Sequence, residues 1–277
     1  MKHFFIFFLF TISFVMPSYS QLQGDSWEKI KGTGKGTLSI VYYEQPGLIQ
    51  KVNGEMKGVC IDILSDFKAF VKQKHNKDID IKYVSNQKEF ASFLSVVQNT
   101  RNVLGVTNTS ITNERKKILK FSPPYMATPV VLLTHENVPT VRDLGQLTKT
   151  FSGFSAEVIA GSTHVKTTEE IRKAHLPSLV IKQVGSSDVV LKDLSVNEKL
   201  FSVLDFTEYV SVVRRKLPVK RHEVDLGGAQ ELGFIMSKQS DWDVLWNEFL
   251  TPEYRKSVAY KKIISENLGA TFLNLVR

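Results

Sequence analysis

Cysteine and histidine are scarce in this sequence, and their placement argues against disulfide, metal and thiol chemistry. Cys60 is the single cysteine among 277 residues, so no internal disulfide can form. It lies in an apolar run, where burial raises the pKa of a thiol and leaves it unreactive. The six histidines include no HxxxH pair and have no neighbouring cysteine, which disfavours a zinc site. No GxSxG motif is present either, so we expect no metal, no cofactor and no catalytic residue.

The sequence also lacks the charge pattern of a nucleic-acid-binding protein. Its 36 Lys and Arg exceed its 28 Asp and Glu, which gives a formal net charge of +8. The excess is spread along the chain, with small clusters at 115–117 and 214–221 and without a basic stripe interleaved with aromatics. We read these clusters as solvated surface and expect no nucleic-acid partner.

Long hydrophobic runs are missing beyond the first twenty residues. The start combines Lys2, an apolar run at 4–15 and the small residues Ser18 and Ser20, a pattern typical of a secretory signal peptide. As a helix the run would extend about 18 Å, too short for a hydrocarbon core of about 30 Å. We expect residues 1–20 to be a signal peptide. Because no cysteine follows the cleavage site to carry a lipid, the mature protein is expected to be periplasmic and unanchored.

What the sequence does contain is an alternation of strand and helix patterns, which predicts an α/β fold with mostly parallel sheets. The first five elements, strand and helix in turn, are expected at 38–43, 62–75, 78–84, 87–98 and 103–106. The polar residues before them, including GTGKGT at 32–37, lack the spacing of a phosphate loop and are expected to be a leader. Later, Thr167 and Glu170 form a possible capping box that would open a helix. A last strand is expected at 232–236.

The most informative stretch is LGVTNTSITNERKKILKFSPPYMATP, at 104–129. A strand runs into a polar loop, Thr112 can cap a short helix, and Arg115 falls in the first turn of that helix. An arginine fork beside the free N–H groups of a helix N-terminus suits a carboxylate. Taken alone, Arg115 is better explained as a surface residue, because most arginines are solvated.

Four segments, in their order along the chain, resemble motifs of the family 3 extracellular solute-binding proteins, the periplasmic receptors of polar amino acid ABC importers. The family's small polar loop with T-x-x-R and F-S-x-P-Y is matched by SITNERKKILKFSPPY at 110–125. Its G-x-x-x-G-[FY]-x-x-D-[LI] is matched by GEMKGVCIDI at 54–63, with a valine in the aromatic position. The family's D-L and G-S-T motifs are similar to residues 143–144 and 161–163, and the stretch between these two segments is unusually long. Its D-A-x-x-x-D resembles LFSVLD at 200–205, where only the last aspartate is kept.

The resemblance implies a set of ligand-binding residues. The motif arginine, Arg115, would hold the α-carboxylate of the ligand, helped by donors of the loop and of the GST turn. Asp205 would hold the α-ammonium group of the ligand, and a residue after the first strand would contact the side chain of the ligand. The full set is Arg115, Asp205, Ser110, Asn108, Thr163, Ser162, Tyr43 and Glu44. Alternatively, Ser110 and Thr163 are ordinary helix caps, and Asp205 caps the helix expected from residue 206.

The resemblance also implies the architecture. We expect the type II periplasmic binding protein fold, with two lobes that are each a mixed, mostly parallel sheet flanked by helices. The ligand would lie in the cleft between the lobes. Residues 38–131 and 233–277 would form lobe 1, and residues 132–232 would form lobe 2.

The function implied is that of a binding protein, not an enzyme. The protein would be a monomer that captures a polar amino acid or similar small carboxylate and delivers it to an inner-membrane ABC permease. Two alternatives stay open. One is an enzyme of the same fold, such as a cyclohexadienyl dehydratase, with His164 and Glu44 as general acid and base and turnover of prephenate or arogenate as its test. The other is an unanchored sensor that feeds a signalling partner.

Overall fold

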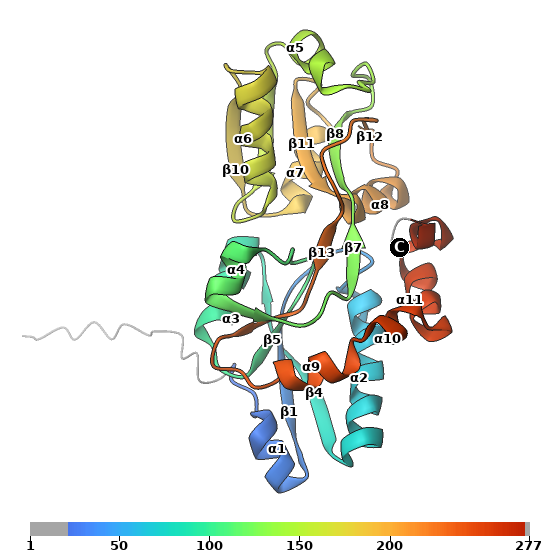
Figure 1. The fold of residues 1–277 in the computed structure, drawn as a ribbon. Coiled ribbons are helices and arrows are strands. Elements are labelled where there is room, and N and C mark those ends of the chain that lie inside the picture. The colour runs from blue at the N-terminus through green and yellow to red at the C-terminus, as the bar shows by residue number, and fades with distance from the viewer. Residues whose placement is uncertain (1–21, 275–277) are drawn as a thin grey trace, which may run out of the picture.

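The structure is a computed structural model that describes residues 22–274, so the expected signal peptide at 1–20 lies outside the described residues. Figure 1 shows two lobes, each with a five-stranded sheet and its own helices. Two short strands, β7 (Met126–Thr128) and β13 (Gln230–Leu232), pair antiparallel and run side by side between the lobes. The chain thus crosses between the lobes along a two-stranded hinge.

Lobe 1 is built on a mixed sheet in which the central strands are parallel. Its strands in spatial order are β4 (Asp78–Gln87), β1 (Lys35–Tyr43), β5 (Val103–Val106), β14 (Ile235–Ser237) and β6 (Leu119–Phe121). β1 is parallel to β4 and β5, whereas β14 is antiparallel to β5 and β6. A hairpin of β2 (Gln50–Val52) and β3 (Glu55–Lys57) precedes the first long helix. The helices are α1 (Trp27–Thr33), α2 (Val59–His75), α3 (Phe90–Asn99), α4 (Asn113–Ile118), α9 (Asp243–Phe249), α10 (Pro252–Lys256), α11 (Val258–Leu268) and the 3-10 turn η3 (Ala270–Asn274).

Lobe 2 repeats this plan with a second mixed sheet. Its strands in spatial order are β10 (Val180–Val184), β9 (Ser155–Ile159), β11 (Leu200–Asp205), β8 (Val130–His135) and β12 (Val219–Arg221). β9, β10 and β11 are parallel, and β8 is antiparallel to β11 and β12. Its helices are η2 (Leu144–Gln146), α5 (Leu147–Thr150), α6 (His164–His175), α7 (Ser187–Leu194) and α8 (Phe206–Arg215). The expected two-lobed α/β fold is confirmed.

Aromatic packing holds α2 on lobe 1. The apolar spacing along 62–75 predicts one buried face, and Ile63, Leu64, Phe67 and Val71 on that face are buried. Phe67 stacks on Trp246 of α9 with ring centroids 3.9 Å apart. Burying a side chain of this size stabilises the fold by about 1.5–3 kcal/mol.

A further apolar cluster crosses between the lobes. It includes Tyr43 and Phe90 from lobe 1, and Ile159 and Leu204 from lobe 2. Tyr43 and Phe90 meet edge to face with centroids 5.7 Å apart. The lobes therefore share buried apolar surface beside the cleft, in addition to the hinge strands.

The residues expected to be a leader are instead part of lobe 1. Ser26 caps α1, whose Trp27 and Ile30 are buried in the core of this lobe, and the GTGKGT segment is divided between α1 and β1. The backbone N–H of Trp27 donates to the carboxylate of Asp241, 214 positions away. The expectation of a leader was wrong because this long-range contact leaves no local pattern.

Two local expectations also differ from the structure. The helix expected to open at a Thr167 capping box begins at His164 instead, so Thr167 lies within α6. The single strand expected at 232–236 is two strands, because β13 ends in the hinge and β14 begins in the sheet of lobe 1.

The expectation for Cys60 is confirmed, since burial raises the pKa of its thiol to about 12.

The topology brings the ends of several strands to one place. β1 and β5 of lobe 1, and β9 and β11 of lobe 2, end where the two lobes face each other. Open sheets with parallel strands bind ligands at such carboxyl ends. Within residues 22–274, no helix combines the length and apolar character needed to cross a membrane.

Candidate functional site

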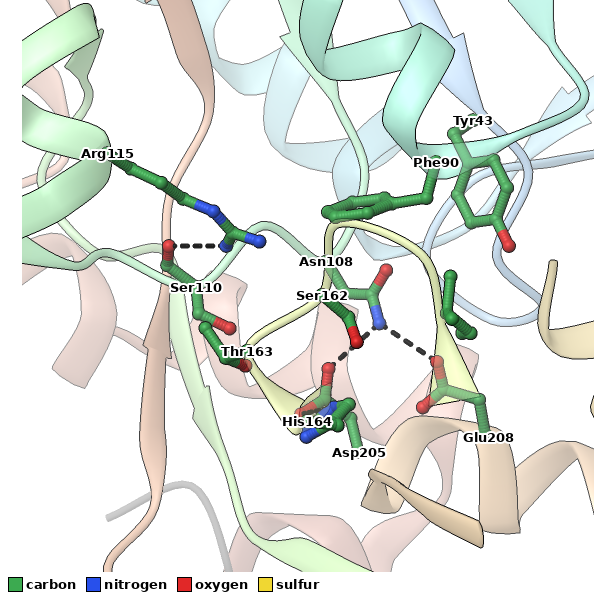
Figure 2. Close-up of a pocket in the computed structure, with 11 residues that line it drawn as sticks. Tyr43, Phe90, Asn108, Ser110, Arg115, Ser162, Thr163, His164, Asp205 and Glu208 are labelled. Carbon is green, nitrogen blue, oxygen red and sulfur yellow. Dashed lines mark hydrogen bonds and ion pairs between the residues drawn. The ribbon is translucent and has the colours of Figure 1, made fainter. Parts of the chain in front are cut away.

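A cavity lies between the lobes at these strand ends (Figure 2). The space open to the centre of a water molecule is about 20 Å³, so the lobes approach each other closely. Seven of the eight residues predicted to bind ligand line this cavity: Tyr43, Asn108, Ser110, Arg115, Ser162, Thr163 and Asp205. The eighth, Glu44, does not line it and accepts a hydrogen bond from Asn86 instead.

Arg115 connects the two lobes at one end of the cavity. The hydroxyl of Thr112 accepts a hydrogen bond from the backbone N–H of Arg115, at 3.1 Å, which confirms the expected cap of α4. The guanidinium donates to the carbonyl of Ser110 and, across the cleft, to that of Gly161, each at 2.9 Å. It also lies over the ring of Phe90, 5.4 Å from the centroid.

The guanidinium remains a cation in this setting. Burial lowers the pKa of Arg115 to about 10, and the negative charge of Asp205 opposes this shift. Only two of its five N–H groups are used by the two carbonyls, and a planar fork of this kind suits a carboxylate.

The other end of the cavity is acidic. The side-chain N–H₂ of Asn108 donates to Asp205 Oδ2 at 2.9 Å and to Glu208 Oε1 at 3.0 Å (Figure 2). Asn108 belongs to lobe 1, whereas both carboxyl groups belong to lobe 2. Burial and the charge of Asp205 raise the pKa of Glu208 above its ordinary range. Glu208 therefore takes up a proton more readily than a solvent-exposed glutamate does.

Several buried polar atoms of the cavity have no hydrogen-bond partner among the described residues. These are Oγ of Ser162, Nδ1 of His164 and Oδ1 of Asp205. Nε2 of His164 is 3.4 Å from Oδ1 of Asp205, which is close enough for an ion pair when the imidazole is protonated. Buried polar atoms are nearly always hydrogen-bonded in folded proteins, so these three atoms are available to a polar ligand or to water in the cavity.

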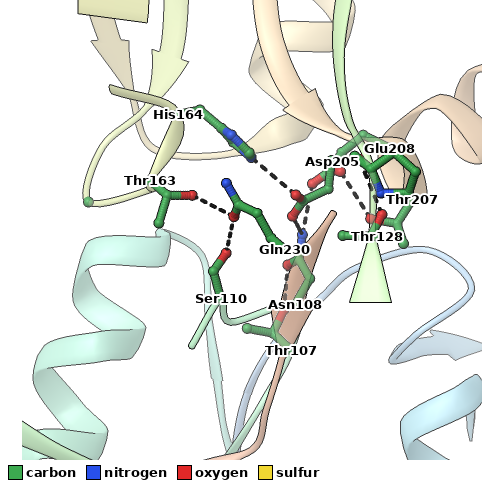
Figure 3. A network of polar contacts seen from close by, with 12 residues as sticks. Thr107, Asn108, Ser110, Thr128, Thr163, His164, Asp205, Thr207, Glu208 and Gln230 are labelled. Atoms are coloured by element: carbon green, nitrogen blue, oxygen red, sulfur yellow. Dashed lines mark hydrogen bonds and ion pairs between the residues drawn. The ribbon is translucent and has the colours of Figure 1, made fainter. Parts of the chain in front are cut away.

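The capping alternatives do not hold for Asp205 and Thr163. Each occupies the N-cap position of its helix, α8 or α6, but neither side chain makes a capping hydrogen bond. The hydroxyl of Thr163 instead donates to Oε1 of Gln230 at 2.9 Å, and that of Ser110 donates to the same atom at 2.5 Å (Figure 3). These side chains are turned toward the space between the lobes.

Sequence reasoning missed several members of the site. Phe90, Ile159 and Glu208 line the cavity. His164 also lines it, although the sequence suggests this residue only as a catalytic candidate. Gln230 lies next to the cavity, where it accepts hydrogen bonds from the hydroxyl groups of Ser110 and Thr163. Glu208 stands three positions after Asp205 at the start of a helix, a spacing that places both on one face and could have revealed it. Phe90 and Ile159 carry no such signal, because apolar residues at strand and helix ends are usually core.

Comparison with known proteins identifies the family. The profile of the bacterial extracellular solute-binding proteins, family 3, matches residues 40–270. This chain belongs to that family. No curated protein sequence matches it.

Several solved structures share the fold with this chain at low sequence identity. An ancestral arginine-binding protein bound to arginine is 22% identical, with a TM-score of 0.65 over 84% of this chain and 98% of the other. A putative L-cystine ABC transporter protein from Listeria monocytogenes is 15% identical, with a TM-score of 0.69 over 87% and 98%. An ancestral amino acid-binding protein, described as a precursor of cyclohexadienyl dehydratase, is 21% identical, with a TM-score of 0.66 over 87% and 98%.

Proposed function

We propose that this family 3 protein captures a polar amino acid, or a similar small zwitterion, between its lobes and delivers it to an ABC permease. The observation that carries the proposal is the separation of charge within one cavity. The Arg115 guanidinium lies at one end, and the Asp205 and Glu208 carboxyl groups lie at the other. A ligand with a carboxylate and an ammonium group complements both ends, because charge-assisted hydrogen bonds are the strongest available.

Two structural neighbours support a role in transport. One is described as an ancestral arginine-binding protein bound to arginine, and the other as a putative L-cystine ABC transporter. The predicted signal peptide at 1–20 and a residue other than cysteine directly after Ser20 support an unanchored periplasmic protein. N-terminal sequencing of the exported protein would test cleavage after Ser20, and a start at Met1 would contradict it.

A thermal-shift screen of the twenty amino acids tests the proposal directly. At a ligand concentration of about 100 times Kd, binding should stabilise the folded protein by about 2.7 kcal/mol. We expect at least one amino acid to raise the melting temperature. If none does at millimolar concentration, an amino acid receptor is ruled out.

A second function, catalysis, is favoured by one observation. Glu208 is a buried carboxyl group with a raised pKa at the cavity, and such a group can act as a general acid near neutral pH. Of the pair considered from the sequence, Glu44 does not line the cavity, so an acid and base would be Glu208 and His164. Prephenate or arogenate turnover by the protein, lost in Glu208→Gln, would establish a dehydratase. If neither prephenate nor arogenate is turned over, ligand binding remains the function that the site supports.

A further inference from the structure

Gln230 joins three parts of the molecule through one oxygen atom. It is the first residue of hinge strand β13, and its Oε1 accepts from Ser110 of lobe 1 and from Thr163 of lobe 2 (Figure 3). These partners are 120 and 67 positions away in the sequence. Gln230 does not itself line the cavity, but both of its partners do.

The two hydroxyl groups cannot serve Gln230 and a ligand at the same time. A serine or threonine hydroxyl has a single O–H proton to donate. Both protons are directed to the amide oxygen of Gln230, at 2.5 Å and 2.9 Å. Both hydroxyl groups line the cavity together with Arg115, where they would donate the same protons to the carboxylate of the ligand, so the two arrangements exclude each other.

We propose that Gln230 is an inter-lobe tie that competes with the carboxylate of the ligand for the Ser110 and Thr163 hydroxyl groups. The competition rests on the proposed function, whereas the tie itself does not. The ligand then binds only to molecules in which the tie is broken, and the measured Kd is the intrinsic Kd divided by the fraction of such molecules. A tie made in about nine molecules of ten would weaken binding about tenfold.

The variant that tests the tie is Gln230→Met. Methionine has similar length but lacks the amide oxygen, and its sulfur is a weak acceptor. The matched control is Glu231→Gln, the next residue of the same strand, because successive side chains of a strand point to opposite faces. Far-UV circular dichroism and the melting temperature establish that each variant is folded.

The first arm measures the tie without any ligand. Lys117 on α4 and Lys173 on α6 are exposed on different lobes and can be replaced by cysteine for spin labelling, while Cys60 is buried. The full chain is unfolded in guanidinium, dialysed and refolded to remove bound molecules. We expect Gln230→Met to shift the inter-lobe distance distribution to longer values by several ångströms, and Glu231→Gln to leave it unchanged. An unchanged distribution in Gln230→Met would overturn the tie.

The second arm measures the competition, with each of the twenty amino acids as probe. We expect Gln230→Met to bind the active amino acid about five- to tenfold more tightly than the unaltered chain. In a Ser110→Ala, Thr163→Val background the same substitution should have no effect, because no hydroxyl remains to compete for. Weaker or unchanged binding in Gln230→Met would overturn the competition, since it would mean that the bonds to Gln230 persist in the complex.

The two arms separate this inference from the proposed function. If the lobes open in Gln230→Met but no amino acid binds to any variant, the tie stands, whereas the proposed function and the competition that rests on it fail. If an amino acid binds but the distance distribution does not change, the proposed function stands and the tie fails.

Discussion

Replacing Arg115 should weaken ligand binding strongly. Its guanidinium holds the carbonyls of Ser110 and Gly161 and leaves further N–H groups for a carboxylate. In Arg115→Ala the carboxylate of the ligand loses its main partner inside a closed cleft. Arg115→Lys keeps the charge, but an ammonium group cannot reproduce the planar fork.

The expected loss follows from the burial of this charge. Truncating one partner of a buried, hydrogen-bonded charge pair costs about 2–5 kcal/mol, which corresponds to an affinity loss of about 30-fold to 4,000-fold. Folding loses the contact with the Phe90 ring and two hydrogen bonds from a charged donor, each worth about 1.5–3 kcal/mol when buried, and the bond to Gly161 is exposed. Arg115→Lys should fall between the unaltered protein and Arg115→Ala in affinity.

Isothermal titration with the amino acid found by the thermal-shift screen measures the effect, and urea unfolding measures stability. The matched control is Lys117→Ala, an exposed cation on the same helix, for which we expect unchanged affinity. If Arg115→Ala binds with the affinity of the unaltered protein, the assignment of the carboxylate site is refuted and Arg115 only links the lobes.

Three further predictions concern the acidic end of the cavity and the core of lobe 2. Asp205→Asn should weaken binding of the amino acid but not of its des-amino analogue in parallel titrations; equal losses for both would contradict an ammonium site. Because the pKa of Glu208 is raised, its carboxyl group is increasingly protonated as the pH falls, so the affinity for a ligand with an ammonium group should rise with pH. Binding titrations from about pH 6 to pH 9 measure this rise, and the affinity of Glu208→Gln should not change over the same range. A flat profile in the unaltered protein would exclude this role. Burial lowers the pKa of His222 to about 4, where Thr134 and the N–H of Val141 contact its ring. The unfolded chain takes up this proton from about pH 6.5 downward, so urea unfolding should show a stability loss of about 3 kcal/mol by pH 4 that is absent in His222→Gln.

Elements that depend on local chemistry could be predicted from the amino-acid sequence. The 3.6-residue spacing of apolar side chains marks α2, and the helix expected at 206–215 coincides with α8. Thr112 caps α4 as expected, because a cap bonds to a backbone N–H only three residues away. The resemblance to the family singled out eight residues, of which seven line one cavity in the structure.

Which of these residues act together depends on contacts that exist only in the folded chain. The raised pKa of Glu208 arises from burial beside Asp205, a condition that exists only after the lobes have formed and met. Gln230 belongs to no motif, and its two partners are 67 and 120 residues away. Trp27 joins lobe 1 through Asp241, so a segment that reads as a polar leader becomes a packed helix. In each case the deciding interaction joins residues far apart in the chain, where neither periodicity nor capping carries information about the partner.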